Sequence, residues 1–191
     1  MDYLDTLSQF SADLDYSKLD SSVKEQVGWI LADTVAAMVA GSAEPELRAI
    51  ANKQTGAPSQ HAAQLIGLGR NSTPEAAAFI NGTAGTFLEM DEGNRFSRGH
   101  PAVHVIPAAL AISQERDASA ESFLAAVVVG YEVGSRLGAA SQLRGAMHPH
   151  GTWGTVGAAA ACARVAGMDA AAIRETINIG ASLSTATSKK T

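Results

Sequence analysis

The chain has 191 residues, a net charge of −5, an isoelectric point near 5.5 and one cysteine. Mild acidity argues against the basic face that binds nucleic acid, and one sulfur excludes a disulfide framework or a metal site of several thiolates. The start, MDYLDTLSQF, lacks the features of a secretory signal, and no uninterrupted apolar run reaches the roughly 20 residues of a membrane span. We therefore expect one cytoplasmic domain, residues 1–191, that binds neither nucleic acid nor membrane.

The first half of the chain predicts two helices. Apolar residues at steps of three and four over residues 22–40 indicate a long amphipathic helix, whose start Ser21 or Ser22 can cap. A second, short helix is expected over 45–54. The run HAAQLIGLG at 61–69 is compatible with a strand or with extended chain, and its type stays open.

The second half predicts further helices. The segment 72–75, Ser-Thr-Pro-Glu, has the form of a capping box with an early proline and should open a helix that extends through Ala84. The helix that starts at Ser119 is apolar nearly all the way round, which is typical of a buried central helix. The remaining helices are expected over 102–114, 151–165 and 169–180. The predicted fold class is all-α.

Groups that can transfer protons are concentrated in two segments, FLEMDEGNRFSRGHPAVHVIPA at 87–108 and RGAMHPHGTWGT at 144–155. Histidine has the side-chain pKa nearest neutrality, so two histidines from two loops can supply an acid and a base. Each segment leads into a predicted helix, and the free N–H groups of a helix start suit a carboxylate ligand. We predict a site where the two segments meet.

Structural roles compete with this interpretation for each histidine. His100 could cap the helix that follows it, and His104, one turn later, has the position of a packed helix histidine. His148 and His150 flank Pro149, so we expect them to point in different directions and at least one of them to be structural or exposed.

A metal site is the main chemical alternative. His100 and His104 are spaced i, i+4, and Asp91 could complete a set of two histidines and a carboxylate. Pro101, however, favours His100 at the helix boundary rather than in its body, and the segment lacks the glutamate of a zinc peptidase. We predict no metal and no other cofactor, and we expect Cys162 to be a small buried apolar residue rather than a nucleophile.

Taken together, the motifs resemble the MmgE/PrpD family, which includes 2-methylcitrate dehydratase, cis-aconitate decarboxylase and iminodisuccinate epimerase. The resemblance extends from about Val23 to Thr187. The matching segments are Ala77 to Gly82, Leu88 to Glu92, His100-Pro101, Gly130 to Val133, and Met147-His148-Pro149 with Thr152, Gly154-Thr155 and Gly157 to Ala159.

The resemblance implies a helical domain, usually dimeric, over which a smaller α+β domain closes on a pocket for a small polycarboxylate. It also implies catalytic roles for His100, His148 and Asp91. Family loops often read Asp-Asp-Thr where this chain continues from Asp91 with Glu, Gly and Asn94, so Asn94 could replace a hydroxyl that contacts substrate. Thr152, in the last matching segment, joins the expected substrate-binding residues.

A substrate with two or three carboxylates also needs cations, and those available are Arg95, Arg98 and Arg144. Family members are more than twice as long as this chain, and further active-site groups, including a lysine, usually lie beyond its last residue. Lys189 and Lys190 lie close to the place of that lysine. We therefore expect the N-terminal part of a truncated or split protein that lacks the lid domain.

The predicted function is a lyase or isomerase that abstracts a proton next to a carboxylate, most simply a dehydration like that of 2-methylcitrate dehydratase. One histidine removes the proton and the other protonates the departing hydroxyl, in an order that the sequence leaves open. Decarboxylation and epimerisation share this proton chemistry. The alternative from another class is a non-catalytic half or pseudoenzyme partner. The helix that carries Val127, Val128, Val129 and Leu137 is apolar on several sides, and each apolar side needs a covering partner. We therefore predict a homo-oligomer or a complementary C-terminal chain.

Overall fold

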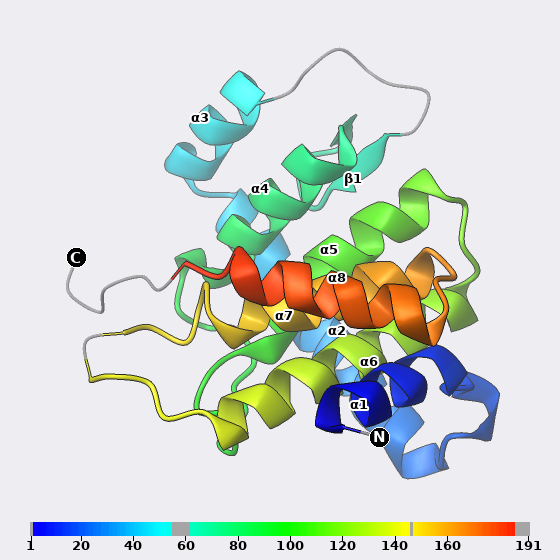
Figure 1. Ribbon diagram of the computed structural model, residues 1–191. Coiled ribbons are helices and arrows are strands. Elements are labelled where there is room, and N and C mark those ends of the chain that lie inside the picture. The colour runs from blue at the N-terminus through cyan, green and yellow to red at the C-terminus, as the bar shows by residue number, and fades with distance from the viewer. Residues whose placement is uncertain (1, 55–61, 146, 186–191) are drawn as a thin grey trace.

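A computed structural model describes residues 2–54, 62–145 and 147–185, and within them the fold is almost entirely helical (Figure 1). The predicted all-α class is confirmed. The elements are α1 (Tyr3–Asp13), the short 3-10 helix η1 (Tyr16–Lys18), α2 (Ser21–Ser42), α3 (Pro45–Gln54), β1 (Ala63–Leu65), β2 (Arg70–Ser72), α4 (Pro74–Phe87), α5 (Pro101–Glu115), α6 (Ala120–Ala140), α7 (Trp153–Val165) and α8 (Ala170–Ser182).

The centre of the fold is the contact between α6 and α7, which approach closely through glycines. A Cβ atom added at Gly130 of α6 would lie 2.7 Å from the carbonyl oxygen of Gly157 in α7, and one added at Gly157 would lie 2.7 Å from the carbonyl oxygen of Gly130. Neither glycine can therefore carry a side chain at this spacing. The consequence is that α7, and the loop before it, are held firmly against α6.

The buried character of α6 is confirmed, and it corrects one expectation. Val127, Val128 and Val129, expected to need a partner chain, are only 1%, 8% and 0% exposed, because other helices of the same chain cover them. Within the described residues α6 is long and apolar enough to suit a membrane span, with half of that stretch buried inside the protein. The core helix of a soluble protein has the same properties.

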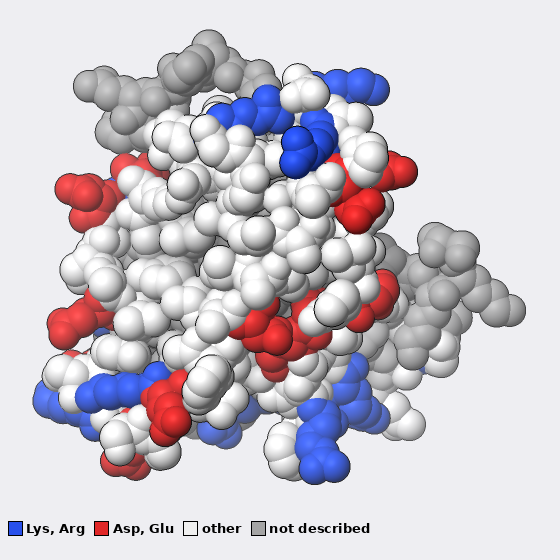
Figure 2. All heavy atoms as spheres, turned by 180° about the vertical axis from the view of Figure 1, so that it is seen from behind, with Lys and Arg blue, Asp and Glu red and all other residues white. Residues whose placement is uncertain are grey.

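The outer helices enclose this centre. α5 packs against α4, α6 and α7, and α2 packs against α4. In Figure 1, α8 crosses in front of α7 and α1 lies beneath it. α1, which the sequence analysis did not predict, is joined to α8 by Arg174, whose Nη2 lies 3.0 Å from Asp2 and whose Nε lies 3.0 Å from Asp5. On the face seen in Figure 2, lysine and arginine side chains lie toward the edges, and the middle is uncharged or acidic.

Two predicted helix starts are wrong in detail. The residue before α2 is Asp20, which makes no side-chain capping bond, so neither Ser21 nor Ser22 caps that helix. The cap of α4 is Thr73, whose hydroxyl oxygen accepts the N–H of Ala76 at 3.3 Å, with Pro74 in the first turn. Ser72 is instead the last residue of a strand, so the expected capping box does not form.

The segment whose type stayed open contains β1, which pairs with β2 in an antiparallel hairpin. The pairs run from Ala63 with Ser72 to Leu65 with Arg70. Asn81 of α4 holds this hairpin, because its amide nitrogen donates to the Gln64 carbonyl and its oxygen accepts the Ile66 N–H, both at 2.9 Å. His61 lies outside the described residues.

Candidate active site

The two histidine-containing loops meet at one hollow. The first loop leads into α5 and the second into α7, so both approach from helix starts. The hollow has a volume of about 510 Å³, and its lining residues are Gly93, Asn94, Arg95, Arg98, Gly99, His100, His148 and Pro149. His100 and His148 thus line the same space, although they come from different loops.

The proton position on His100 follows from its neighbours. Its Nδ1 lies 2.9 Å from the carbonyl oxygen of Glu92, 3.3 Å from the carbonyl oxygen of Asp91 and 3.3 Å from the Asp91 carboxylate. All three are acceptors, so Nδ1 must be the nitrogen that carries the proton. The neutral ring then has its lone pair on Nε2.

Asp91 lies behind His100 rather than in the hollow. Its side chain is only 3% exposed, and burial raises the pKa of the carboxyl, while His100 opposes this rise. The Asp91 Oδ2 atom accepts no hydrogen bond, because the N–H of His100 is directed at the Glu92 carbonyl, so the contact between Asp91 and His100 is electrostatic. Asp91 is placed to orient His100 and to stabilise its charged form.

Glu92, to which the sequence analysis assigned no role, caps α5. Its Oε2 accepts the N–H of Ala102 at 3.2 Å, and its Oε1 accepts the hydroxyl of Tyr131 at 2.6 Å. The Tyr131 oxygen in turn accepts from the Asn94 amide at 3.1 Å. His100 occupies the N-cap position but its side chain makes no capping bond, so the idea that it caps the helix is wrong.

Asn94 shapes the first loop as well. Its side-chain oxygen accepts the backbone N–H groups of Phe96 at 2.9 Å and Ser97 at 3.0 Å. Its backbone pairs with that of Gly99, which closes a tight loop in which Arg98 adopts a left-handed conformation with φ +56°. Most of the bonding capacity of Asn94 is therefore used within the protein.

The second loop contradicts the expectation that His148 and His150 point apart. Their ring centroids are only 4.4 Å apart. The chain folds back after Pro149, because its carbonyl accepts both the N–H of Thr152, at 3.1 Å, and the Thr152 hydroxyl, while Gly151 adopts φ +80°. Proline restricts its own φ and the residue before it, but it does not fix the direction of the residue after it.

The same turn sets the proton position on His148. The backbone N–H of His150 donates to Nδ1 of His148 at 3.1 Å. This nitrogen must be unprotonated to accept, so the neutral ring carries its proton on Nε2. His100 and His148 therefore line one hollow in opposite tautomers, with a lone pair at Nε2 of the first and a proton at Nε2 of the second.

His104 and His150 complete a cluster of four histidines. The ring of His150 lies 5.2 Å from that of His100 and 4.7 Å from that of His104 between centroids. Burial, with a contribution from the other histidines, lowers the pKa of His104 to about 4 and that of His150 to about 3. Both rings are therefore neutral at neutral pH. His104 is packed against α7, since a Cβ atom at Gly154 would lie 2.5 Å from its ring.

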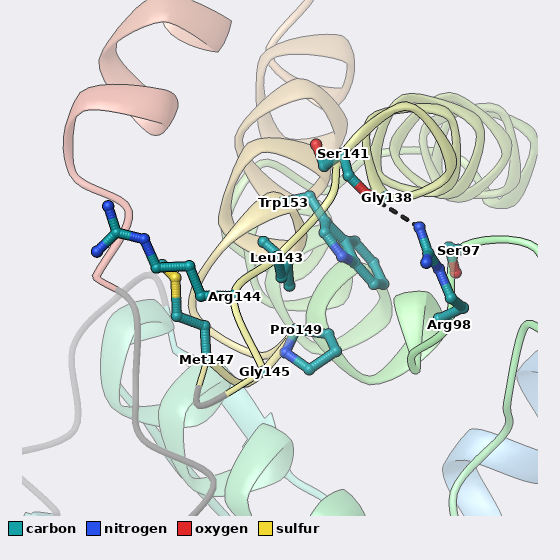
Figure 3. Close-up of a pocket in the computed structure, with 10 residues that line it drawn as sticks. All are labelled: Ser97, Arg98, Gly138, Ser141, Leu143, Arg144, Gly145, Met147, Pro149 and Trp153. Carbon is teal, nitrogen blue, oxygen red and sulfur yellow. Dashed lines mark hydrogen bonds between the residues drawn. The ribbon is translucent and has the colours of Figure 1, made fainter.

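The predicted substrate-binding residues separate into two groups. Arg95 and Arg98 line the hollow with the histidines, and Arg98 also ties the loops together by donating to the Ser141 carbonyl at 2.9 Å. Arg144 lines a smaller hollow of about 120 Å³ beside it, and Figure 3 shows its guanidinium directed away from Arg98. Thr152 lines neither hollow. Lys189 and Lys190 lie outside the described residues.

Trp153 forms the wall between these loops and α6. It is 4% exposed, and a Cβ atom at Gly99 would lie 2.6 Å from its ring, while one at Gly138 would lie 2.9 Å from it (Figure 3). Trp153 is not among the site residues predicted from the sequence. The sequence does contain a signal for it, namely the glycines near this tryptophan. A glycine has no side chain, so it lets the backbone pack directly against a large aromatic ring.

The geometry of a metal site is not met within residues 2–54, 62–145 and 147–185, where no group of three or more histidine, cysteine or acidic side chains is arranged to hold an ion. In particular, the three candidate metal ligands His100, His104 and Asp91 do not converge on one point. Nδ1 of His100 faces Asp91, whereas the ring of His104 faces α7 and His150.

Comparison with known proteins agrees with this fold. Residues 5–190 match the family model described as the MmgE/PrpD N-terminal domain. A cis-aconitate decarboxylase-like protein of Aspergillus oryzae is 27% identical over 173 residues, which cover 85% of this chain and 36% of that protein. The chain thus spans about a third of the length of this curated relative.

Proposed function

Because the chain belongs to the MmgE/PrpD family, we propose that it acts, alone or with a further chain, as a lyase on a small di- or tricarboxylate. The reaction proposed first is dehydration by proton abstraction next to a carboxylate, like that of 2-methylcitrate dehydratase. The observation that supports it is the placement of His100 and His148 at one hollow in opposite tautomers.

In this proposal His100 is the general base. Its Nε2 lone pair accepts the proton of the acidified C–H bond, and the electron pair of that bond forms the new carbon–carbon double bond. The Nδ1–H group, bonded to the Glu92 carbonyl, keeps the ring in the required tautomer. The nearby carboxylate of Asp91 stabilises the imidazolium that forms.

His148 is then the acid partner, which assists the leaving group. Its Nε2–H donates a hydrogen bond to the departing hydroxyl as the C–O bond breaks, and the hydroxyl leaves as water with a proton taken from solvent. His148 stays neutral throughout, whereas His100 ends the step protonated and returns its proton to solvent. The two tautomers support this order of base and acid, which the sequence left open.

The carboxylates of the substrate are proposed to bind Arg95 and Arg98. Arg95 is exposed in the hollow, and Arg98 borders it with its position fixed by Ser141. The start of α5 is a poorer carboxylate site than the sequence predicted, because Glu92 already accepts the Ala102 N–H and brings its own negative charge. Arg144 and Thr152 are left out of the proposed set.

The second candidate reaction is decarboxylation, which the similarity to a cis-aconitate decarboxylase-like protein favours. Carbon dioxide would leave, and the resulting carbanion would take a proton from solvent beside the Nε2–H group of His148. The two reactions are distinguished by incubating the protein, with and without a complementary C-terminal chain, with methylcitrate, citrate and cis-aconitate. Absorbance of a new conjugated double bond indicates dehydration, and release of carbon dioxide indicates decarboxylation. Silence on all three substrates with the second chain present contradicts the proposal and favours a pseudoenzyme.

Matched variants test the residues. General acid–base catalysis contributes about 10²–10⁴-fold, so His148→Gln and His100→Gln should each lower turnover by about that factor with little change in melting temperature. Arg95→Ala should raise KM by about 10–100-fold, because a hydrogen bond between charged groups contributes about 1.5–3 kcal/mol. Arg144→Ala is the control, since it removes an exposed arginine that lines the neighbouring hollow and is directed away from Arg98.

We also propose that the chain forms a homo-oligomer or binds a complementary chain. An apolar groove of about 270 Å³ between α2 and α6, which includes the exposed Val23, supports this proposal, as does Trp29 of α2 at 66% exposure. Sedimentation at micromolar concentration tests it, and a clean monomer counts against self-association.

A further inference from the structure

His150 lies at the centre of the histidine cluster. The centroid of its ring is 4.4 Å from that of His148, 4.7 Å from that of His104 and 5.2 Å from that of His100. Two of these neighbours come from the start of α5 and the third from its own loop. The ring thus occupies the space between the two histidines proposed for proton transfer and the body of α5.

The far side of the cluster faces a second hollow, of about 380 Å³, between α4 and α5. His104 and His150 border it, and its other lining residues are Ala78, Phe79, Gly82, Thr83, Thr86, Val103, Pro107 and Ala108. None of these eight carries a charge. The four rings therefore form a wall with His100 and His148 on the side of the arginines and His104 and His150 on the uncharged side.

The surroundings of His150 keep it neutral. The titratable groups that face it are His104 and His100 from α5 and His148 from its own loop, with the carboxylates of Asp91 and Glu92 behind His100. Burial first, and then these histidines, lower the pKa of His150 to about 3. A neutral ring can pack between the proposed base and acid without adding a charge beside a base that must accept a proton.

The turn that carries His150, residues 149–152, is held in place by several contacts. Its N–H donates to Nδ1 of His148 at 3.1 Å. The carbonyl of Pro149 accepts from Thr152, which closes the turn, and the Thr152 carbonyl accepts the hydroxyl of Ser184 at 3.0 Å from the end of α8. A Cβ atom at Gly151 would lie 2.5 Å from the backbone oxygen of Thr185, so the turn has no room to shift toward α8.

We propose that His150 is a positioning residue for the acid–base pair: its ring holds the rings of His100 and His148 in their relative placement, and its backbone N–H fixes the tautomer of His148. What the pair does catalytically rests on the proposed function. The placement of the rings can be measured without any substrate, so the two ideas can fail separately.

The test is nitrogen NMR of the full chain with labelled histidine side chains. The wild-type protein should show the Nδ1–H form of His100 and the Nε2–H form of His148. His150→Ala keeps the backbone N–H but removes the ring that packs beside His148, so the His148 ring can turn away from that N–H and should become a mixture of tautomers. His150→Phe keeps a ring in that place and should keep both tautomers. Phe79→Ala, which removes a ring from the other wall of the second hollow, is the control and should change neither.

Turnover gives the second readout. A misplacement of about 1 Å can cost about 10²-fold, so His150→Ala should lower kcat by about that factor with KM nearly unchanged and an altered pH profile, whereas His150→Phe should lose far less. If His150→Ala does not fold, His150→Gln provides the same comparison, since it also removes the ring. Unchanged tautomers in the variant that lacks the ring overturn the proposal, whatever its turnover. If His150→Ala alters the tautomers but the wild-type protein turns over no substrate even with a complementary chain, the positioning role is supported and the proposed function is overturned.

Discussion

Replacing His104 with leucine should make the protein less sensitive to acid. His104 is buried between α5 and α7, and burial lowers the pKa of its ring from 6.5 to about 4. The unfolded chain takes up a proton near pH 6.5, whereas the folded protein resists doing so until about pH 4. Lowering the pH through this window therefore favours unfolding, and above pH 6.5 neither state holds the proton and the contribution vanishes.

The size of the effect follows from the two pKa values. One pKa unit corresponds to about 1.4 kcal/mol, so complete protonation of His104 costs the folded state about 3 kcal/mol. Between pH 7 and pH 5, where only the unfolded state is protonated, the loss is about 2 kcal/mol. His150 acts in the same direction. Asp91 and Glu92, whose pKa values burial raises, act in the opposite direction as the pH falls, and they are present in both proteins compared.

The assay is urea unfolding followed by circular dichroism at pH 8, 7, 6 and 5. The free energy of unfolding of the wild type should fall by about 2 kcal/mol more than that of His104→Leu between pH 7 and pH 5. The interval from pH 8 to pH 7 is the internal control, because the two proteins should change equally there. If both proteins lose the same stability between pH 7 and pH 5, the ring of His104 does not stay neutral in the folded state and the reasoning is refuted.

Three further predictions concern the scaffold. Gly130→Ala should destabilise the protein by about 1–3 kcal/mol in urea unfolding, because the new methyl group would lie 2.7 Å from the carbonyl oxygen of Gly157 in the facing helix. Gly28→Ala is the control, since its methyl group would meet nothing within 4 Å, and it should stabilise the protein by about 0.5–1 kcal/mol. Equal effects of the two substitutions would contradict the close packing of α6 and α7. Tyr131→Phe should cost about 2 kcal/mol, measured the same way, because it removes a hydrogen bond to the half-buried carboxylate of Glu92, and an unchanged midpoint would mean that water replaces the hydroxyl. Cys162, whose thiol pKa burial raises to about 11, should react slowly with thiol reagents at pH 8 in the folded protein and rapidly after denaturation.

The fold could be predicted to a large extent because helix periodicity is a local signal. The expected helices over 45–54 and 102–114 are α3 and α5 within one residue at each end. α1 was missed although it carries a signal, since Asp2 and Asp5 cap its start reciprocally. The caps of α2 and α4 were wrong by one residue or more, because several neighbouring Ser, Thr and Asp residues can all cap and the sequence does not choose among them.

The site could be predicted only in part. The sequence indicated that His100 and His148 would meet, and the structure places both at one hollow. It could not show that Glu92 caps α5, because Glu92 reaches the helix from ten residues before Ala102, outside the span of any local capping rule. It misjudged His150 because the direction of that ring depends on Thr152 and Gly151, which follow it.

The place of Trp153 gives the molecule a built-in optical probe. The chain has two tryptophans, of which Trp153 is 4% exposed against Gly99 and Gly138, whereas Trp29, within α2, is 66% exposed. Their emission should therefore differ in wavelength and in access to a soluble quencher. A Trp29→Phe protein would carry a single tryptophan, beside the loops of the hollow, so the tryptophan emission would follow the assembly of the site directly, in unfolding, in acid and when a carboxylate is added.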